Sequence, residues 1–165
     1  MSFIDGLRVE LYEGYNFDTL RTISQETTVN ISDQHDLDQG GDGNTFSIRA
    51  TGQIQAYAEG SNTWKVRSDD GVKIWIDDVL VVNRWNDHPP TWDTFTVSGL
   101  NKDSWHDIKI EHYEKTGVAV LDLYHSNQST LVTQLRTAIP TVQSVSSSTA
   151  DGTYTTGDVI TINVL

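Results

Sequence analysis

Alternation of apolar and polar residues with a period of two is the feature that most limits the fold of this chain. The period is clear in the segments 44–58, 63–70 and 106–114, which are separated by clusters of Gly, Asn, Asp and Pro. Successive side chains of a β-strand point to opposite faces, so this period predicts strands. We expect about eight or nine strands, with helical periodicity confined to a turn or two at 18–23. The pattern predicts an all-β protein that folds as an antiparallel β-sandwich or barrel.

The composition narrows the range of possible functions. The chain carries 23 Asp and Glu against 11 Lys and Arg, a formal net charge of −12, which argues against a nucleic-acid partner because such a partner needs a basic face. It has no cysteine, which removes disulfides, thiolate zinc sites and cysteine nucleophiles. Two interpretations of the acidic charge stay open: a surface that is merely soluble, or loop carboxylates neutralised by bound cations.

Neither membrane insertion nor a signal peptide is expected. The apolar runs are short, as in VLVV at 79–82, and too short to cross a bilayer. The first residues, MSFIDGL, lack a basic region followed by an apolar one, although this leaves export open.

The composition changes near Ala138. From there to residue 165 the chain is rich in Ser and Thr and has no Lys or Arg, with strand-like pieces at 141–148 and 158–164. This tail resembles the first strands of the Ig-like extender repeats of large bacterial surface adhesins. We therefore predict one domain at 3–135, followed at 136–165 by a linker and the truncated start of an Ig-like extender domain. An edge strand or tail of the same domain is the alternative.

The stretch KVRSDDGVKIWIDDVLVVNRW, residues 65–85, places two aspartates side by side. A strand brings Asp69 and Asp70 to its end, Gly71 permits a tight turn, and 72–76 forms the next strand. The pair at 77–78 then makes a hairpin turn. The return strand therefore places residues 85–88 at the same end of the sheet as the first pair.

A second hairpin is expected, with strands at 107–113 and 118–124 and Glu114 in its turn. If this turn lies at the end of the sheet that carries Asp69, it brings Glu114 to the same rim. Two adjacent carboxylates and oxygens from a second loop are ligands that calcium prefers, and the cation would offset the repulsion between the aspartates. The alternative is a solvated acidic turn, since adjacent acidic residues are common in turns.

The segment RSDDGVKIWIDDVLVVNRW resembles the core signature of the protective-antigen-type (PA14) domain, an antiparallel β-sandwich. The usual form is strand, Ser-Asp-Asp-Gly, hydrophobic strand, Ile-Asp-Gly, hydrophobic strand, and Trp. GLRVELYEGYNF is similar to the family's opening strand, and DIKIEHYEKTGVAVLDLYH to its closing hairpin. The resemblance covers roughly residues 5–127, with the landmarks in the family's order.

The resemblance implies a ligand set. In the lectin branch of the family, which includes yeast flocculins, epithelial adhesins and bacterial repeats-in-toxin (RTX) adhesins, a cis peptide joins the two aspartates. Both coordinate calcium, and the calcium binds sugar hydroxyls directly. Carried over, these aspartates are Asp69 and Asp70, and the closing loop adds the Glu114 side chain and the carbonyls of Thr116 and Val118.

Lys115 would then project toward the sugar. The chain departs from the yeast lectins in having Glu114 where they have asparagine, a shorter loop, Asp78 in place of the hairpin glycine, and no disulfides. The last two differences indicate a bacterial member.

Two further loops are candidates. Trp85, Asn86 and His88 lie at the predicted rim and combine an aromatic ring with polar groups, as sugar sites do; alternatively, Trp85 closes the end of the core. Asp36, Asp38 and Asp42 lie in a glycine-rich loop that could hold a second calcium, or could be solvated. No hydrolase or phosphate-binding motif is present, and no catalysis is expected.

We therefore expect a calcium-dependent carbohydrate-binding module of a large secreted bacterial adhesin. It would act outside the cell, binding glycans on host or neighbouring cell surfaces or in biofilm, as part of a longer multidomain chain. The alternative is a structural or accessory β-sandwich that is not a lectin, for example one attached to a glycoside hydrolase.

Overall fold

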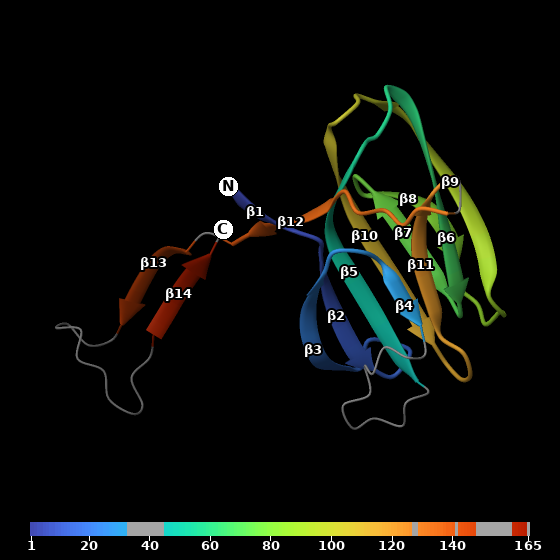
Figure 1. Cartoon of the computed structure of the whole chain (residues 1–165). Coiled ribbons are helices and arrows are strands. Elements are labelled where there is room, and N and C mark those ends of the chain that lie inside the picture. Colours follow the sequence, from blue (N-terminus) through green and yellow to red (C-terminus); the bar gives the residue numbers. More distant parts are fainter. Residues whose placement is uncertain (33–44, 127–128, 141, 148–159, 165) are drawn as a thin grey trace. The chain divides into compact units, whose positions relative to one another are not determined.

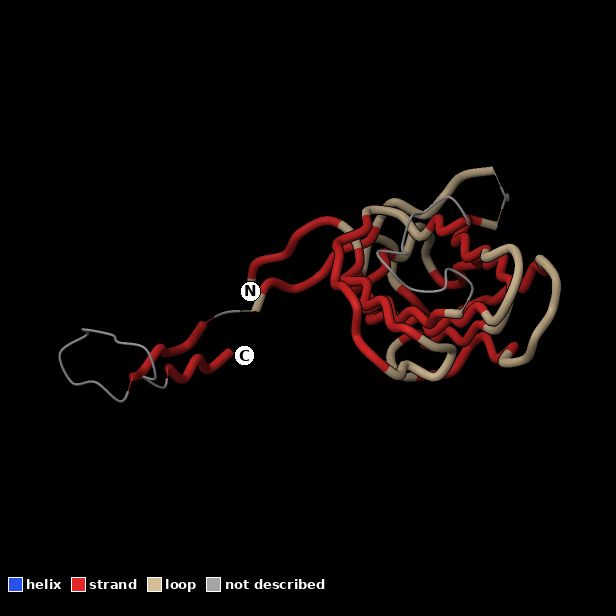
Figure 2. Tube along the Cα trace, turned by 90° about the horizontal axis from the view of Figure 1, so that it is seen from below, coloured by secondary structure: helices blue, strands red, loops and turns tan. Residues whose placement is uncertain are grey.

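The computed structural model describes residues 1–32, 45–126, 129–140, 142–147 and 160–164, and the side chains of these up to residue 140. The chain divides into two compact units. One comprises Asp5–Thr137, and the other Met1–Ile4 together with Ala138–Leu165. Every regular element of the described residues is a β-strand (Figures 1 and 2). The described residues contain no helix long and apolar enough to span a membrane.

Two antiparallel sheets form the larger unit, apart from residues 2–4 and 138–139 of the first sheet, which belong to the smaller unit. Figure 1 shows the sheets as two layers. The first sheet has the order β1-β12-β5-β10-β7-β8, with β2 also paired to β5 and β3 to β2. Its strands are β1 (Ser2–Asp5), β2 (Leu7–Glu13), β3 (Thr19–Glu26), β5 (Phe46–Gln55), β7 (Val72–Ile76), β8 (Val79–Arg84), β10 (Trp105–Glu114) and β12 (Leu135–Ile139). The second sheet has the order β4-β11-β6-β9. Its strands are β4 (Asn30–Ser32), β6 (Gly60–Asp69), β9 (Thr91–Leu100) and β11 (Val120–His125). The predicted all-β antiparallel sandwich is confirmed.

The alternating pattern is what builds the core. In β10 the side chains of Ile108, Ile110 and His112 are buried, while those between them are half-exposed. Trp64 of β6 is fully buried and stacks on Phe95 of β9, with ring centroids 5.7 Å apart. Each fully buried Ile, Leu or Val side chain contributes about 1.5–3 kcal/mol relative to exposure, so this face holds the sheets together.

The β7–β8 hairpin turns at Asp77 and Asp78, as predicted. Both residues have positive φ, 47° and 63°, which is the conformation of a two-residue type I′ turn. Asp is one of the few side chains that tolerate this region, so Asp78 can stand where the family has glycine.

Three expectations about these sheets are wrong. Among the described residues the two sheets hold twelve strands, more than the eight or nine expected. Residues 18–23 do not form helical turns: Thr19–Glu26 is strand β3, paired along β2, which supplies a ready partner for its backbone. The segments 107–113 and 118–124 do not form a hairpin, because β10 belongs to the first sheet and β11 to the second. The loop between them crosses from one layer to the other.

The smaller unit contains β13 (Val142–Ser147) and β14 (Ile160–Val164), which pair antiparallel. The strands predicted at 141–148 and 158–164 are therefore present over their described residues.

Candidate metal centre

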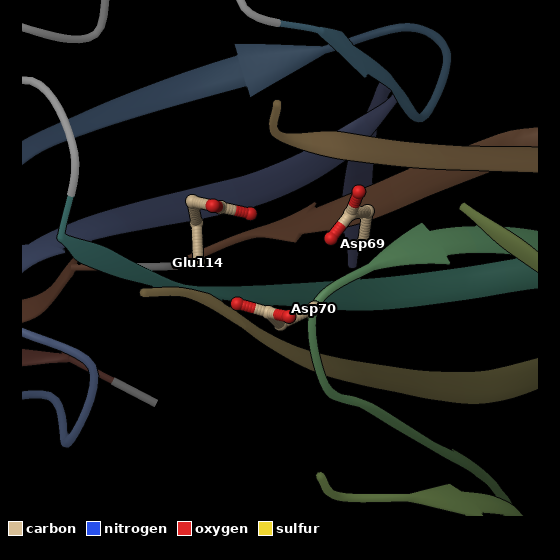
Figure 3. A group of neighbouring side chains, drawn as sticks. All are labelled: Asp69, Asp70 and Glu114. Carbon is tan, nitrogen blue, oxygen red and sulfur yellow. The ribbon is translucent and has the colours of Figure 1, made fainter. Parts of the chain in front are cut away.

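Three carboxylates meet at one end of the sandwich. Asp69 and Asp70 stand at the end of β6, in the second sheet, and Glu114 ends β10, in the first. Oxygens of the three side chains all lie within 4.8 Å of one another. The side chains are buried, with only 8%, 6% and 1% of their residues' surface exposed. Figure 3 shows the three groups gathered around a common space between the strands.

Glu114 is the last residue of β10, and not part of the turn where we expected it. It lies two residues after His112 and on the same face of the strand, so both side chains point between the sheets and are almost fully buried. The loop begins at Lys115, and carries Thr116 and Val118 on exposed positions. Their carbonyls remain predicted ligands.

Hydrogen bonds fix the position of Asp70. The peptide bond between Asp69 and Asp70 is cis, as the resemblance implied. The amide of His88 donates to Oδ1 of Asp70 at 3.0 Å, and the amide of Lys115 donates to Oδ2 at 3.1 Å. Two loops that each cross from the first sheet to the second are thus tied to one carboxylate. Each oxygen of this carboxylate retains a second lone pair for a cation.

Gly71 is required for a reason other than the turn we predicted. Its φ lies outside the left-handed region, but a Cβ there would overlap the ring of Tyr113. The carbonyl of Gly71 also accepts a hydrogen bond from the amide of Tyr113, at 3.0 Å, and lies 3.1 Å from Nδ1 of His112. Only glycine lets β10 approach the Asp69–Asp70 segment this closely.

The donor set fits calcium. Calcium–oxygen distances are about 2.3–2.6 Å, so two oxygens on one ion lie at most about 5.2 Å apart, and the three carboxylates meet this limit. Three ionised carboxylates in a buried site repel one another and have lost much of their hydration, and a divalent cation offsets both costs. Oxygen-only ligands of this hardness favour calcium over zinc or copper.

The neighbouring imidazole brings no positive charge to this end of the sandwich. Burial lowers the pKa of His112 to about 3, and the hydrogen bond with the Gly71 carbonyl only partly counteracts this effect. At neutral pH the cluster is therefore not neutralised by His112.

A rim of polar and aromatic side chains, which we call the 87/115 rim, lies beside the cluster. Asp87 accepts hydrogen bonds from Nζ of Lys115, at 2.9 Å, and from the hydroxyl of Tyr113, at 2.8 Å. These two bonds lower the pKa of Asp87, and the same carboxylate raises the pKa of Lys115. The ring of Tyr15 lies 5.6 Å from Nζ of Lys115. Lys115 thus stands at the rim, paired with an acidic partner.

The other predicted rim residues have separate roles. The ring of Trp85 is half-exposed and contacts Phe17, Tyr113 and Lys73, with Nζ of Lys73 4.7 Å from its centroid. It therefore packs on the outer side of the first sheet and does not close the core.

Asn86 and His88 lie on the loop that follows β8. Asn86 is exposed, and its side-chain amide donates to the Asp87 carbonyl at 2.9 Å. His88 contacts the cluster through its main chain.

Sequence reasoning placed Asp87 in the rim loop without giving it a role, and passed over Tyr113 and Tyr15 as parts of the site. Tyr113 could have been found, since it directly precedes Glu114. Tyr15 follows β2, far from the motif, and the sequence offers no signal for it. Asp36, Asp38 and Asp42, the candidate ligands of a second calcium, lie outside the described residues.

A chain of hydrogen bonds at the opposite end of β7 has the residue types of a catalytic triad. Nε2 of His106 lies 2.7 Å from Oγ of Ser104, and its Nδ1 lies 2.7 Å from Oδ2 of Asp77. The amide of Ser104 is already bonded to the Asn101 carbonyl, so it is not free to bind an oxyanion. This chain of hydrogen bonds anchors the β7–β8 turn.

The family model of the PA14 domain matches residues 5–146. Anti-sigma-I factor RsgI3 of Acetivibrio thermocellus is 28% identical over 139 residues, a match that covers 84% of this chain and 21% of that protein. This chain thus spans about a fifth of that relative's length. A solved anti-sigma factor domain-containing protein has a TM-score of 0.73 and 25% identity, over 82% of this chain and 49% of the other.

Two solved sugar-binding proteins share the fold. The PA14 sugar-binding domain from an RTX adhesin has a TM-score of 0.56 and 15% identity, over 78% of this chain and 93% of that one. The A domain of epithelial adhesin 9 from Candida glabrata, solved in complex with Galβ1-3GlcNAc, has a TM-score of 0.56 and 12% identity, over 82% and 90%. The family model covers most of the chain and the architecture agrees with it, so this protein belongs to the PA14 domain family.

Proposed function

We propose that this chain is a calcium-dependent carbohydrate-binding module. The observation that carries the proposal is the cluster of three buried carboxylates from two sheets, whose oxygens lie within 4.8 Å of one another at the loop end of the sandwich. Asp69, Asp70 and Glu114 would hold the ion, with main-chain carbonyls of Thr116 and Val118 as further ligands. When bound, calcium supplies coordination positions that two neighbouring sugar hydroxyls can take in place of water.

The protein's own residues prepare this site before any ligand arrives. The amides of His88 and Lys115 hold the Asp70 carboxylate from two directions, and these bonds fix the positions of the two adjoining loops relative to the cluster. The 87/115 rim offers a carboxylate that accepts hydrogen bonds, an ammonium that donates them and a phenol that can do both, all beside the cluster. Neutral hydroxylated ligands suit such a mixed rim.

Binding at one such site is expected to be weak, with a Kd on the order of micromolar to millimolar, since a small ligand buries little area. Display of many copies would raise the avidity. We propose that the module belongs to a longer secreted bacterial adhesin, with residues 136–165 leading into a neighbouring extender domain. There it would attach cells to glycans of other cell surfaces or of biofilm.

A second context is favoured by the similarity to anti-sigma factors. In that context the same carbohydrate site would serve as the sensing part of a regulatory protein, and sugar binding would be the signal. The chemistry of the site is the same in both cases.

The test is retention on immobilised glycans with and without calcium. Wild type should bind a subset of glycans in calcium, release them in chelator, and rebind when calcium is restored. Asp70→Ala should bind none while keeping its circular dichroism spectrum. Asp78→Asn, which removes a carboxylate at the far end of β7, is the matched control and should bind as wild type. Glycan binding that survives the chelator or Asp70→Ala would overturn the proposal.

A further inference from the structure

A polar cleft opens at the edge of the sandwich, between β8 of the first sheet and β9 of the second. The two strands lie at corresponding edges of their sheets and are not paired with each other. The cleft has a volume of about 250 Å³. Its polar walls are formed by Asn83, Arg84, Asn86, Asp93 and Thr94.

The charges of this cleft cancel. Nε of Arg84 lies 2.6 Å from Oδ2 of Asp93, and a second guanidinium nitrogen lies 2.8 Å from Oδ1, so the pair forms a two-pronged bridge between the sheets. A phosphate site needs a surplus of positive charge, and a cation site needs a surplus of carboxylates. This cleft has neither, so its chemistry fits a neutral ligand.

The remaining walls suit hydroxyl groups. Asn83, Asn86 and Thr94 are exposed, and each can both donate and accept a hydrogen bond. Val81 and Val82 also line the cleft, but Val82 is only 6% exposed, so the accessible wall is mainly polar. A saccharide presents hydroxyl groups around its ring, and a cleft below the usual range of about 300–1,000 Å³ for drug-sized ligands suits one sugar unit.

The cleft lies close to the carboxylate cluster. Asn86 lines the cleft, and His88, two residues further on, donates its amide to Asp70. Two residues span at most about 7 Å of chain. One wall of the cleft therefore belongs to the same loop that holds Asp70.

We infer that the β8–β9 cleft is a second saccharide subsite, and that the natural ligand is a neutral oligosaccharide or polysaccharide chain. This inference rests on the proposed function, because the first unit of the chain is taken to occupy the calcium site. The cleft then selects for chain length and linkage, while the calcium site holds one unit of any suitable sugar.

The test compares short and long ligands by isothermal titration calorimetry in calcium. The probes are glucose, galactose, mannose and a linear tetrasaccharide of each. For the sugar that binds, we expect the tetrasaccharide to bind more tightly than its monosaccharide. The double variant Asn83→Ala/Thr94→Ala should lose about threefold to tenfold in tetrasaccharide affinity, as expected for one or two hydrogen bonds, with monosaccharide affinity unchanged. Thr96→Ala, on β9 but outside the cleft, is the matched control.

The outcomes separate the two proposals. Equal affinity for both lengths, or an unchanged tetrasaccharide affinity in the double variant, overturns the subsite and leaves the calcium-dependent lectin in place. An equal loss for both ligands indicates a general disturbance of the rim and also overturns the subsite. Absence of any sugar binding by a calcium-loaded protein overturns both proposals.

Discussion

A hydrogen bond of 3.1 Å from the amide of Lys115 to Oδ2 of Asp70 ties the loop after β10 to the end of β6. The loop crosses between the two sheets, so this bond joins the layers at the point where the carboxylates gather. Asp70 is therefore both a predicted metal ligand and the anchor of the loop that carries other predicted ligands.

Substitutions of Asp70 should separate these two roles. Asp70→Asn keeps an oxygen that can accept the Lys115 amide, whereas Asp70→Ala loses both the ligand and the anchor. Both variants should lose calcium binding, but only Asp70→Ala should show faster hydrogen exchange at the Lys115 amide, measured by NMR without calcium. Equal exchange in the two variants would show that the bond does not order the loop.

Among the residues of the first sheet, Glu114 should contribute most to the calcium affinity. Mutation of residues that only hydrogen-bond to a metal's ligands typically costs about 10–100-fold in metal affinity. Because Glu114 is itself a predicted ligand, Glu114→Gln should weaken calcium binding by at least roughly tenfold. The control is Glu111→Gln, on the outer face of the same strand, where the carboxylate pairs with Arg49 at 3.1 Å. Calorimetric titration with calcium gives both values. An unchanged calcium affinity in Glu114→Gln would remove this residue from the site.

Gly71→Ala should destabilise the protein by about 1–3 kcal/mol, because the added methyl group overlaps the Tyr113 ring. In a Tyr113→Ala background the same substitution should cost clearly less, since the overlap is gone. Urea denaturation of the four proteins measures this coupling. Equal costs in the two backgrounds would contradict the steric explanation.

Asp122 should make stability depend on pH. It is 7% exposed, and burial raises its pKa, with the charge of Arg67 acting in the opposite direction. A carboxyl whose pKa is raised by folding favours the protonated form, so its contribution to stability falls as pH rises from the ordinary value of 3.8 through the raised value.

The Asp122→Asn side chain cannot ionise, so the stability of this variant relative to wild type should rise as the pH increases from 3 to 7. Thermal melts at both pH values, without calcium, measure the difference. If the variant were destabilised relative to wild type, and more so at pH 7 than at pH 3, this explanation would be contradicted.

The sequence predicts much of this molecule because the alternating pattern is strong where strands are half-buried. The β7–β8 hairpin follows from the Asp77–Asp78 turn, and the pairing of strands places 85–88 beside Asp70, as found. The prediction of helical turns at 18–23 was wrong because β3 lies at an edge of its sheet and most of its side chains are exposed, which leaves no alternating signal.

The assignment of strands to sheets is a long-range property that local patterns do not encode. Nothing in the residues 114–118 distinguishes a hairpin from a loop that crosses between layers, so Glu114 was placed in the turn. For the same reason the contact between Tyr15 and Lys115, which are 100 positions apart in the chain, had no signal in the sequence.

The most direct test of the central claim is a crystal structure of this chain grown with calcium and the glycan selected by the retention experiment. We predict an ion about 2.3–2.6 Å from oxygens of Asp69, Asp70 and Glu114, with two hydroxyls of one sugar unit completing its shell. A structure in which the three carboxylates hold no ion, or in which protein oxygens fill every coordination position, would contradict the account.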